Sequence, residues 1–116
     1  MEHDPVVTNP DLYRVVMENE RVRVLEYRDV PGDRTTPHRH PDSVMVTISS
    51  FRRRLVGHGG KVEVDLPAGI TRWVPAQEHA GENIGDTETH VIFVELKDPA
   101  PSGPTREPNT PGPSAS

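Results

Sequence analysis

Three histidines in the middle of the chain have the types and the spacing of a metal site. His38 and His40 stand two residues apart, and His79 follows further along the chain. Successive side chains of a strand point to opposite faces, so His38 and His40 share one face and can bind a single ion from the same side. Three neutral imidazoles suit Zn, Cu, Fe or Ni and leave a coordination position open for water, dioxygen or substrate. The pattern therefore predicts one divalent transition metal in a catalytic centre.

Glycine and asparagine residues frame these histidines at regular intervals. Gly32 lies six residues before His38, while Gly69 lies ten residues before His79 and Asn83 four residues after it. In these residues the chain resembles a small single-domain cupin, a family with a Gly and His-x-His motif followed by a Gly, His and Asn motif. The resemblance implies a double-stranded β-helix, the jelly-roll barrel of that family, with the three histidines as its metal ligands.

The chain departs from the cupin pattern at two places. The glutamate that the first motif places shortly after its histidines is absent, because the two candidate positions hold Val44 and Met45. The Pro-x-Gly of the second motif is replaced by Pro75-Ala76-Gln77, and the gap to His79 is one residue shorter. Without a carboxylate ligand, a bound divalent ion keeps its full positive charge and favours an anionic, chelating substrate such as an enolate or a carboxylate.

Cupins without this glutamate include mononuclear iron dioxygenases that act on diketones or thiols. Others use zinc or nickel as a Lewis acid for isomerisation, cyclisation or hydrolysis. The resemblance therefore implies a metal-dependent enzyme, dioxygenase-like or isomerase/cyclase-like, that acts on an oxygenated small molecule. Three alternatives stay open: a cupin that has lost its metal, a non-catalytic small-molecule-binding or accessory cupin of a biosynthetic pathway, and a partner of a biosynthetic protein recruited through the proline-rich tail.

Gln77 and Arg53 are polar candidates for contacts with a substrate. Gln77 stands two residues before His79, where its amide could donate a hydrogen bond to a metal-bound substrate, become a ligand, or face solvent from a turn. The first of these roles makes it the catalytic candidate. If Phe51 and Leu55 face the interior, period two turns Arg53 inward as well, where it would anchor a carboxylate or a phosphate. The alternative for Arg53 is a solvated strand face.

Two apolar residues are candidates for the wall that faces the substrate. Val44, Val46 and Ile48 share one strand face, which we expect to point into the barrel, with Val44 at the place of the missing glutamate. Trp73 is the only tryptophan and would serve either in core packing or as a platform on which a substrate stacks. Val44 and Trp73 are therefore assigned to substrate binding together with Arg53.

The rest of the chain has the pattern of short strands separated by turns. Runs rich in β-branched and aromatic residues recur every ~8–12 residues, and no segment has a sustained helical period. This pattern predicts an all-β sandwich or barrel, with about eight to ten strands between residues 11 and 97. The expected strands include 13–17, 21–29, 44–50, 51–58, 61–66, 70–74 and 89–97.

Length and composition divide the chain into three parts. A chain of 116 residues is one domain. We expect an arm at residues 1–10, the barrel at residues 11–97, and a disordered tail at residues 98–116, which holds six of the thirteen prolines. The strand expected at 21–29 has apolar residues on both faces and needs cover, which predicts a homodimer.

Charge and composition indicate which kinds of partner and which cellular compartment to expect. The net charge of −5 and the pI of about 5.6 argue against nucleic acid, whose affinity comes largely from basic residues that neutralise phosphates. The lack of cysteine excludes disulfides and thiolate ligands. No apolar run approaches the ~18 residues of a membrane span, and the first residues lack a signal-peptide pattern. We therefore expect a cytoplasmic protein that binds a small-molecule substrate, with no nucleic acid or membrane partner.

Overall fold

Nine β-strands and one short helix follow one another through residues 3–97, the part of the chain that this computed structural model describes. Every region expected to be a strand contains one, and the number of strands agrees with the expectation. The tail predicted at residues 98–116 lies outside the described residues. The elements are α1 (Pro5–Thr8), β1 (Tyr13–Glu18), β2 (Val22–Asp29), β3 (His38–His40), β4 (Ser43–Thr47), β5 (Phe51–Gly57), β6 (Gly60–Leu66), β7 (Thr71–Val74), β8 (Gln77–Asn83) and β9 (Thr89–Leu96).

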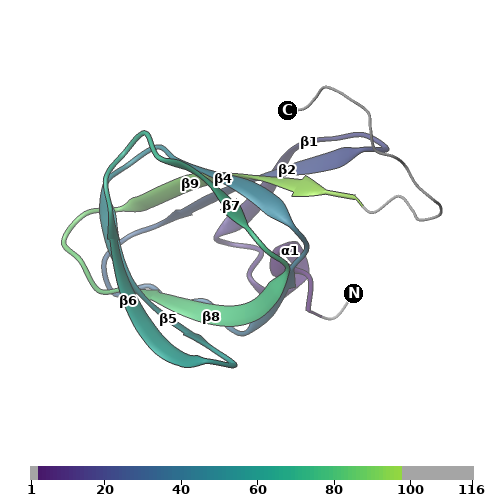
Figure 1. Ribbon diagram of the computed structural model, residues 1–116. Coiled ribbons are helices and arrows are strands. Elements are labelled where there is room, and N and C mark those ends of the chain that lie inside the picture. Colours follow the sequence, from purple (N-terminus) through teal and green to yellow (C-terminus); the bar gives the residue numbers. More distant parts are fainter. Residues whose placement is uncertain (1–2, 98–116) are drawn as a thin grey trace.

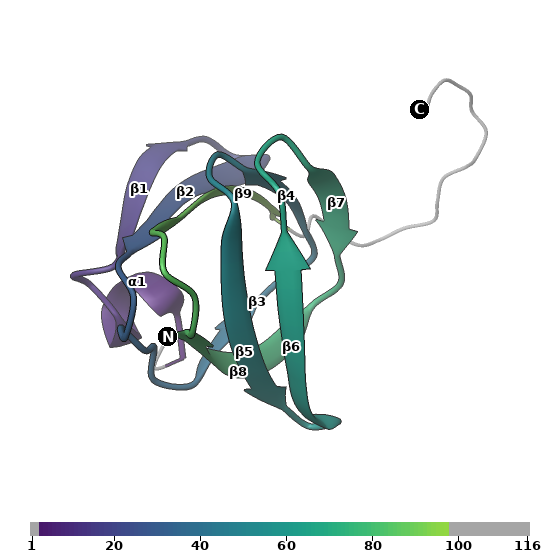
Figure 2. The same ribbon diagram turned by 90° about the vertical axis from the view of Figure 1, so that its left-hand side faces the viewer.

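Two antiparallel sheets form the walls of a barrel. The five-stranded sheet has the order β1-β2-β9-β4-β7, and the four-stranded sheet has the order β3-β8-β5-β6. Figures 1 and 2 show the two sheets on opposite sides of the interior, with α1 close to one end of the barrel. Most strands pair with partners distant in the sequence, such as β2 with β9 and β3 with β8. The predicted all-β fold is confirmed.

The two motif glycines occupy turns that need a left-handed backbone. The φ angle is 93° at Gly32 and 87° at Gly69, a region that residues with a Cβ rarely adopt. The Gly32 N–H donates to the Asn83 carbonyl over 3.0 Å, and the Gly69 N–H donates to the Thr47 carbonyl over 2.8 Å. The first turn is therefore hydrogen-bonded to the end of β8, and the second turn to the end of β4.

The face of β4 that points into the barrel is the opposite of the one expected. Ser43 and Thr47 are fully buried, whereas Ile48 is 49% exposed and lies with Val44 and Val46 on the outer side of the sheet. Thr47 can face inward because its hydroxyl donates to the Pro67 carbonyl over 2.8 Å and accepts from the Ile70 N–H. The prediction that Val44, Val46 and Ile48 line the interior is wrong, since alternation shows which residues share a face but not which face is inside.

The buried interior has an apolar part and a polar part. Tyr13, Leu25 and Tyr27 form the apolar cluster, against which partly buried residues such as Phe93 pack. The largest fully buried side chains also include several polar residues, which an ordinary core would exclude unless each were hydrogen-bonded. They are His38, His40, Asn83, Thr47, Thr89 and Ser43.

The N-terminal arm packs on its own barrel. Asp4 caps α1 by accepting the Val6 N–H over 3.0 Å. The carbonyl of His3 accepts the Arg39 N–H over 2.7 Å, which ties the arm to β3. The arm therefore belongs to the structure that surrounds the histidines.

No helix in the described residues is long and apolar enough to cross a bilayer.

Candidate metal centre

The three predicted ligands come together on two paired strands of the four-stranded sheet. His38 and His40 alternate on β3, and His79 of β8 lies directly opposite His38 in the antiparallel register. One ring nitrogen from each histidine lies within 4.8 Å of the corresponding nitrogens of the other two. His38 and His40 are each 1% exposed, and His79 is half-buried beside them. The pairing of two short strands thus brings ligands distant in the sequence to one point.

Each histidine is held at its Nδ1 atom by a different acceptor. His38 Nδ1 lies 2.8 Å from the Thr36 carbonyl, and His79 Nδ1 lies 2.8 Å from Gln77 Oε1. His40 Nδ1 lies 3.1 Å from Glu95 Oε2. A ring nitrogen that faces an acceptor must carry the proton, so all three rings adopt the Nδ1–H tautomer and offer the Nε2 lone pair to a metal.

Tyr13 closes the centre from the five-stranded sheet. Its hydroxyl lies 3.2 Å from His38 Nε2 and 3.3 Å from His40 Nε2, so these two nitrogens face the same point. Burial raises the pKa of the Tyr13 hydroxyl well above its ordinary range, and the hydroxyl therefore stays protonated and donates. Sequence reasoning missed Tyr13, because nothing local connects the first strand with histidines 25 and 27 residues away.

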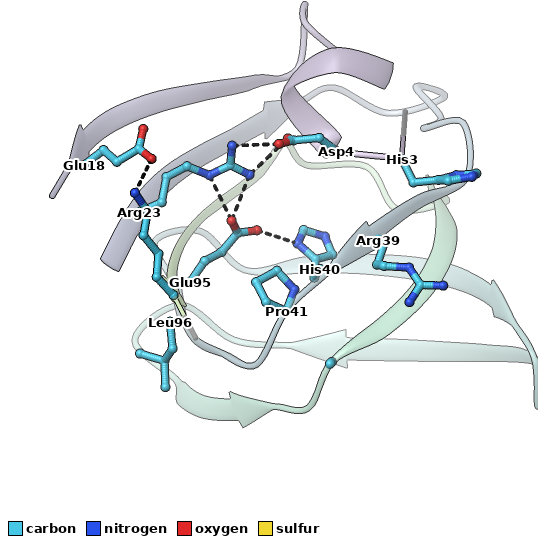
Figure 3. A pocket seen from close by; sticks show the side chains of 11 residues that line it. His3, Asp4, Glu18, Arg23, Arg39, His40, Pro41, Glu95 and Leu96 are labelled. Carbon is cyan, nitrogen blue, oxygen red and sulfur yellow. Dashed lines mark hydrogen bonds and ion pairs between the residues drawn. The ribbon is translucent and has the colours of Figure 1, made fainter. Parts of the chain in front are cut away.

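A chain of charged groups on the inner face of the five-stranded sheet supports His40. Arg23 Nη2 lies 2.9 Å from Glu95 Oε1, and Arg23 Nη1 lies 2.9 Å from Asp4 Oδ2. Figure 3 shows Glu95 between Arg23 and His40, with Asp4 on the far side of the guanidinium. The network lies in the wall of a surface groove of about 570 Å³. Because a carboxylate held on both sides cannot turn away, it fixes the orientation of the His40 ring.

The arm also supports His38. The Asn9 side chain accepts the Thr36 N–H over 2.9 Å and donates to the Thr36 carbonyl over 3.3 Å, which is the carbonyl that holds His38. Asn9 is 7% exposed. Neither this contact nor the Arg23–Glu95 pair was expected from the sequence, since the first depends on how the arm folds back over the barrel and the second on the pairing of β2 with β9.

A cavity of about 170 Å³ lies inside the barrel next to the histidines. Most of its wall is apolar, and no aspartate or glutamate lines it. Its polar lining comes from two histidines, two arginines, Gln77, and hydroxyl groups of the five-stranded sheet and of Thr35. The lining includes His38, His79, Gln77, Arg53, Arg72, Met45, Tyr13, Phe51, Leu55, Val64, Leu66, Val74 and Phe93. Such a cavity, apolar with a few convergent polar groups, suits a small molecule.

Comparison with solved structures identifies relatives with the same fold. A cupin domain from Bordetella pertussis Tohama I is 35% identical, with a TM-score of 0.71 over 75% of this chain and 93% of that chain. The chain belongs to the cupin family. A double-stranded β-helix protein from Klebsiella pneumoniae is 25% identical, with a TM-score of 0.60 over 73% of this chain and 75% of that chain. The double-stranded β-helix inferred from the sequence is thereby confirmed.

A polyketide cyclase from Streptomyces resistomycificus shares the fold at 18% identity, with a TM-score of 0.54 over 72% of this cupin and 63% of that chain. Comparison with protein-family models and with curated proteins found no match. The family membership of this cupin therefore rests on the structural relatives and on the three clustered histidines.

The predicted contact residues of the cupin divide into inward and outward groups. Gln77 lines the cavity and accepts from His79, and Arg53 faces the interior, as the alternation predicted. Val44 and Trp73 are cross-strand partners on the outer face of the sheet, where Trp73 is 52% exposed. Contrary to expectation, Val44 and Trp73 do not line this cavity. Their neighbours Met45 and Arg72, which are also cross-strand partners, line the cavity instead.

The charge of Arg53 is balanced inside the barrel. Its Nη1 lies 2.6 Å from Asp29 Oδ2 and 3.1 Å from the Thr89 hydroxyl, and its Nη2 lies 3.2 Å from the Tyr27 hydroxyl. Asn83 donates to the other oxygen of Asp29 over 3.0 Å. Arg53 is thus part of a buried, hydrogen-bonded network that joins the two sheets, and Asn83 of the second cupin motif belongs to this network.

The histidine set of this cupin fits a divalent transition metal. Burial lowers the pKa of His38 to about 4 and that of His79 to about 3, with the nearby histidines adding to the effect. The two rings are therefore neutral near pH 7, which is the form that binds a metal. Three neutral Nε2 donors with held Nδ1 protons suit zinc, iron, nickel or copper.

Proposed function

We propose that this cupin is a metal-dependent enzyme that acts on an oxygenated small molecule. The observation that carries the proposal is that three histidines, each held at Nδ1, bring one ring nitrogen apiece within 4.8 Å of one another beside an internal cavity. A structural site would close the coordination sphere with protein ligands, whereas three imidazoles leave a position open. A metal bound there would supply Lewis acidity or, if it is iron, a centre for dioxygen chemistry.

The residues around the centre have separate tasks in this proposal. The apolar wall of the cavity excludes water from a bound substrate. The Tyr13 hydroxyl, which lies within hydrogen-bond distance of His38 Nε2 and His40 Nε2 and can donate to one of them at a time, would donate a hydrogen bond to an oxygen of the substrate. Gln77 orients His79 through its Oε1 and donates from its Nε2 to the Pro75 carbonyl over 3.2 Å, which fixes the amide orientation.

Metal content and turnover test the proposal. Protein purified without chelator should hold close to one transition metal per chain, and the loaded protein should turn over one member of a panel of diketones, thiols and enolisable acids. Assays with and without dioxygen separate dioxygenation from isomerisation, and the polyketide cyclase that shares the fold makes cyclisation one of the reactions to include. Less than about 0.2 metal per chain, with no uptake of Fe, Zn, Ni or Cu, would contradict the proposal.

The variant His79→Ala removes one ligand and should lower zinc affinity by at least about tenfold. His58→Ala is the matched control, because His58 is exposed in the turn between β5 and β6 and is not one of the three clustered histidines. Equal affinities of the two variants would show that His79 is not a ligand.

A non-catalytic binding protein is the second candidate function. The Tyr13 hydroxyl can donate its single proton to His38 Nε2 or to His40 Nε2 without a metal, which supports a barrel that binds a small molecule through its cavity alone. A ligand-induced rise in melting temperature that survives His38→Ala would support this candidate over the enzyme.

We also propose that the cupin forms a homodimer through the outer face of its five-stranded sheet. In the described residues, ten large hydrophobic side chains are exposed, whereas five form the buried core. Trp73 and Ile48 on this face are 52% and 49% exposed, and Val24 lies there on β2. A second copy would bury this face as stacked sheets do. Light scattering should give a dimer mass for the wild type and a lower mass for Trp73→Glu; a monomeric wild type at tens of micromolar would contradict the proposal.

A further inference from the structure

The cavity beside the histidines has a net positive lining. Two arginines and no carboxylate contribute to its wall. The charge of Arg53 is balanced by Asp29 at 2.6 Å, so Arg53 adds little to the field inside the cavity. Arg72 makes no ion pair and no side-chain hydrogen bond with any residue between 3 and 97. The unbalanced charge of the cavity therefore belongs to Arg72.

The place of Arg72 relative to the histidines follows from the strand register. Arg72 of β7 is the cross-strand partner of Met45, which in turn pairs with Phe93. The Phe93 ring stacks on His40 with 5.0 Å between ring centroids. Arg72 thus lies two strands away from Phe93, the residue that stacks on His40, on the same inner face of the sheet. Its side chain is exposed, which places it at the rim of the cavity.

We propose that Arg72 anchors a carboxylate of the ligand, so that the cavity takes a small carboxylic acid whose oxygenated end faces the histidines. The oxygenated end of the ligand is inferred from the proposed function, on which this proposal rests. The carboxylate end is inferred from the unpaired guanidinium of Arg72. A guanidinium donates two parallel hydrogen bonds to a carboxylate, a geometry that a lone arginine can satisfy completely. The apolar part of the cavity wall, which includes Phe51, Leu55 and Val74, matches a short hydrocarbon linker.

The charge of the site favours a carboxylate over a phosphate. A phosphate monoester carries nearly two negative charges, and Arg72 is the one cavity-lining cation in the described residues whose charge is not already balanced. A carboxylate carries a single negative charge, which Arg72 balances alone. The carboxylate of the ligand would therefore contact Arg72 of β7. From the sequence alone, Arg53 of β5 was expected in this role.

A matched set of diketones tests the proposal. The probes are 4,6-dioxoheptanoate, its methyl ester and acetylacetone, which share the 1,3-diketone but differ in the carboxylate. Titration calorimetry with the zinc-loaded full chain avoids oxidative turnover, because zinc has no redox chemistry. The wild type should bind the acid about tenfold or more tightly than the ester, the size expected for a charge-assisted bidentate pair at a partly exposed site.

The variants Arg72→Met and Arg72→Lys identify the residue responsible. The acid preference should fall below about threefold in Arg72→Met and return in part in Arg72→Lys, because lysine keeps the charge but not the fork. Arg21→Met is the charge-matched control, since Arg21 is exposed between β1 and β2 and does not line the cavity. An acid preference that survives Arg72→Met, or that is equally lost in Arg21→Met, would overturn the proposal.

Titration of the metal-free protein separates this proposal from the proposed function. If the chain bound no zinc, the metal-dependent function would fail, and the acid-over-ester preference of the metal-free protein would still report on Arg72. If zinc bound at the histidines and the wild type bound acid and ester equally, the metal centre would stand and the carboxylate anchor would be wrong.

Discussion

His40 Nδ1 and Glu95 Oε2 lie 3.1 Å apart, although β3 and β9, which carry the two residues, belong to different sheets. Both side chains are almost completely buried, at 1% and 3% exposure. The contact therefore couples the orientation of a candidate metal ligand to the packing of the two sheets. Arg23 and Asp4 extend it to the N-terminal arm, so that the arm belongs to the support of the centre.

Glu95→Gln should lower zinc affinity by about tenfold, because partners that orient metal-bound histidines typically contribute about 10- to 100-fold. Glutamine keeps the size of the side chain but removes the charge that both His40 and Arg23 contact. Competition with a fluorescent zinc chelator measures the affinity. Glu63→Gln, an exposed partner of Arg52 and Arg54, is the control and should not change it. An unchanged affinity in Glu95→Gln would show that His40 needs no carboxylate.

Met45→Glu should restore the carboxylate that cupin centres usually contain. Met45 lines the cavity next to Phe93, which stacks on His40, so a glutamate there can reach the open coordination position. We expect zinc affinity to rise by about tenfold or more, because a charged ligand joins three neutral ones.

Val44→Glu is the control for this prediction. Val44 lies on the outer face opposite Trp73, where a carboxylate is too far from the histidines to ligate. Its zinc affinity should equal that of the wild type. Tighter zinc binding by Val44→Glu than by Met45→Glu would mean that β4 presents its other face to the interior.

Arg53→Met should destabilise the metal-free protein by about 3–5 kcal/mol, because it leaves the buried carboxylate of Asp29 without its cation. Asp29 is 4% exposed and Arg53 is 7% exposed, so water cannot replace the lost partner. Urea denaturation followed by the fluorescence of Trp73 measures the change. Arg52→Met removes an exposed arginine one residue away, and its effect should stay within about 0.5 kcal/mol. Similar effects of the two substitutions would contradict the buried network.

The metal-free protein should lose stability as the pH falls from 7 to 4. The pKa of His38 is lowered from 6.5 to about 4 in the folded chain, mainly by burial. Between these values the unfolded chain binds a proton that the folded chain does not, so the free energy of unfolding falls with the pH, by about 3 kcal/mol for His38. His79, with a folded pKa of about 3, acts in the same direction.

Chemical denaturation across this pH range, with chelator present, compares the wild type with His38→Asn. The variant should have a flatter profile between pH 6.5 and 4, because asparagine does not titrate. His58→Asn changes an exposed histidine and should keep the wild-type profile. Parallel profiles for the wild type and His38→Asn would mean that His38 is not buried in its neutral form.

The sequence by itself determined the strands and the three histidines. Strand alternation, turn glycines and the spacing of His38 and His40 are local properties, set by the geometry of a few neighbouring residues. The shared face of the two histidines is therefore present as expected.

Only the tertiary structure decided which face of each strand is inside and which groups meet there. On β4 the apolar residues, such as Val44, face outward, because Thr47 finds its hydrogen bonds inside the barrel. The contacts of His40 with Tyr13 and Glu95 join residues 27 and 55 positions apart. Such contacts form only when the two sheets close on each other, because the energy of a buried polar group depends on partners that the local sequence does not contain.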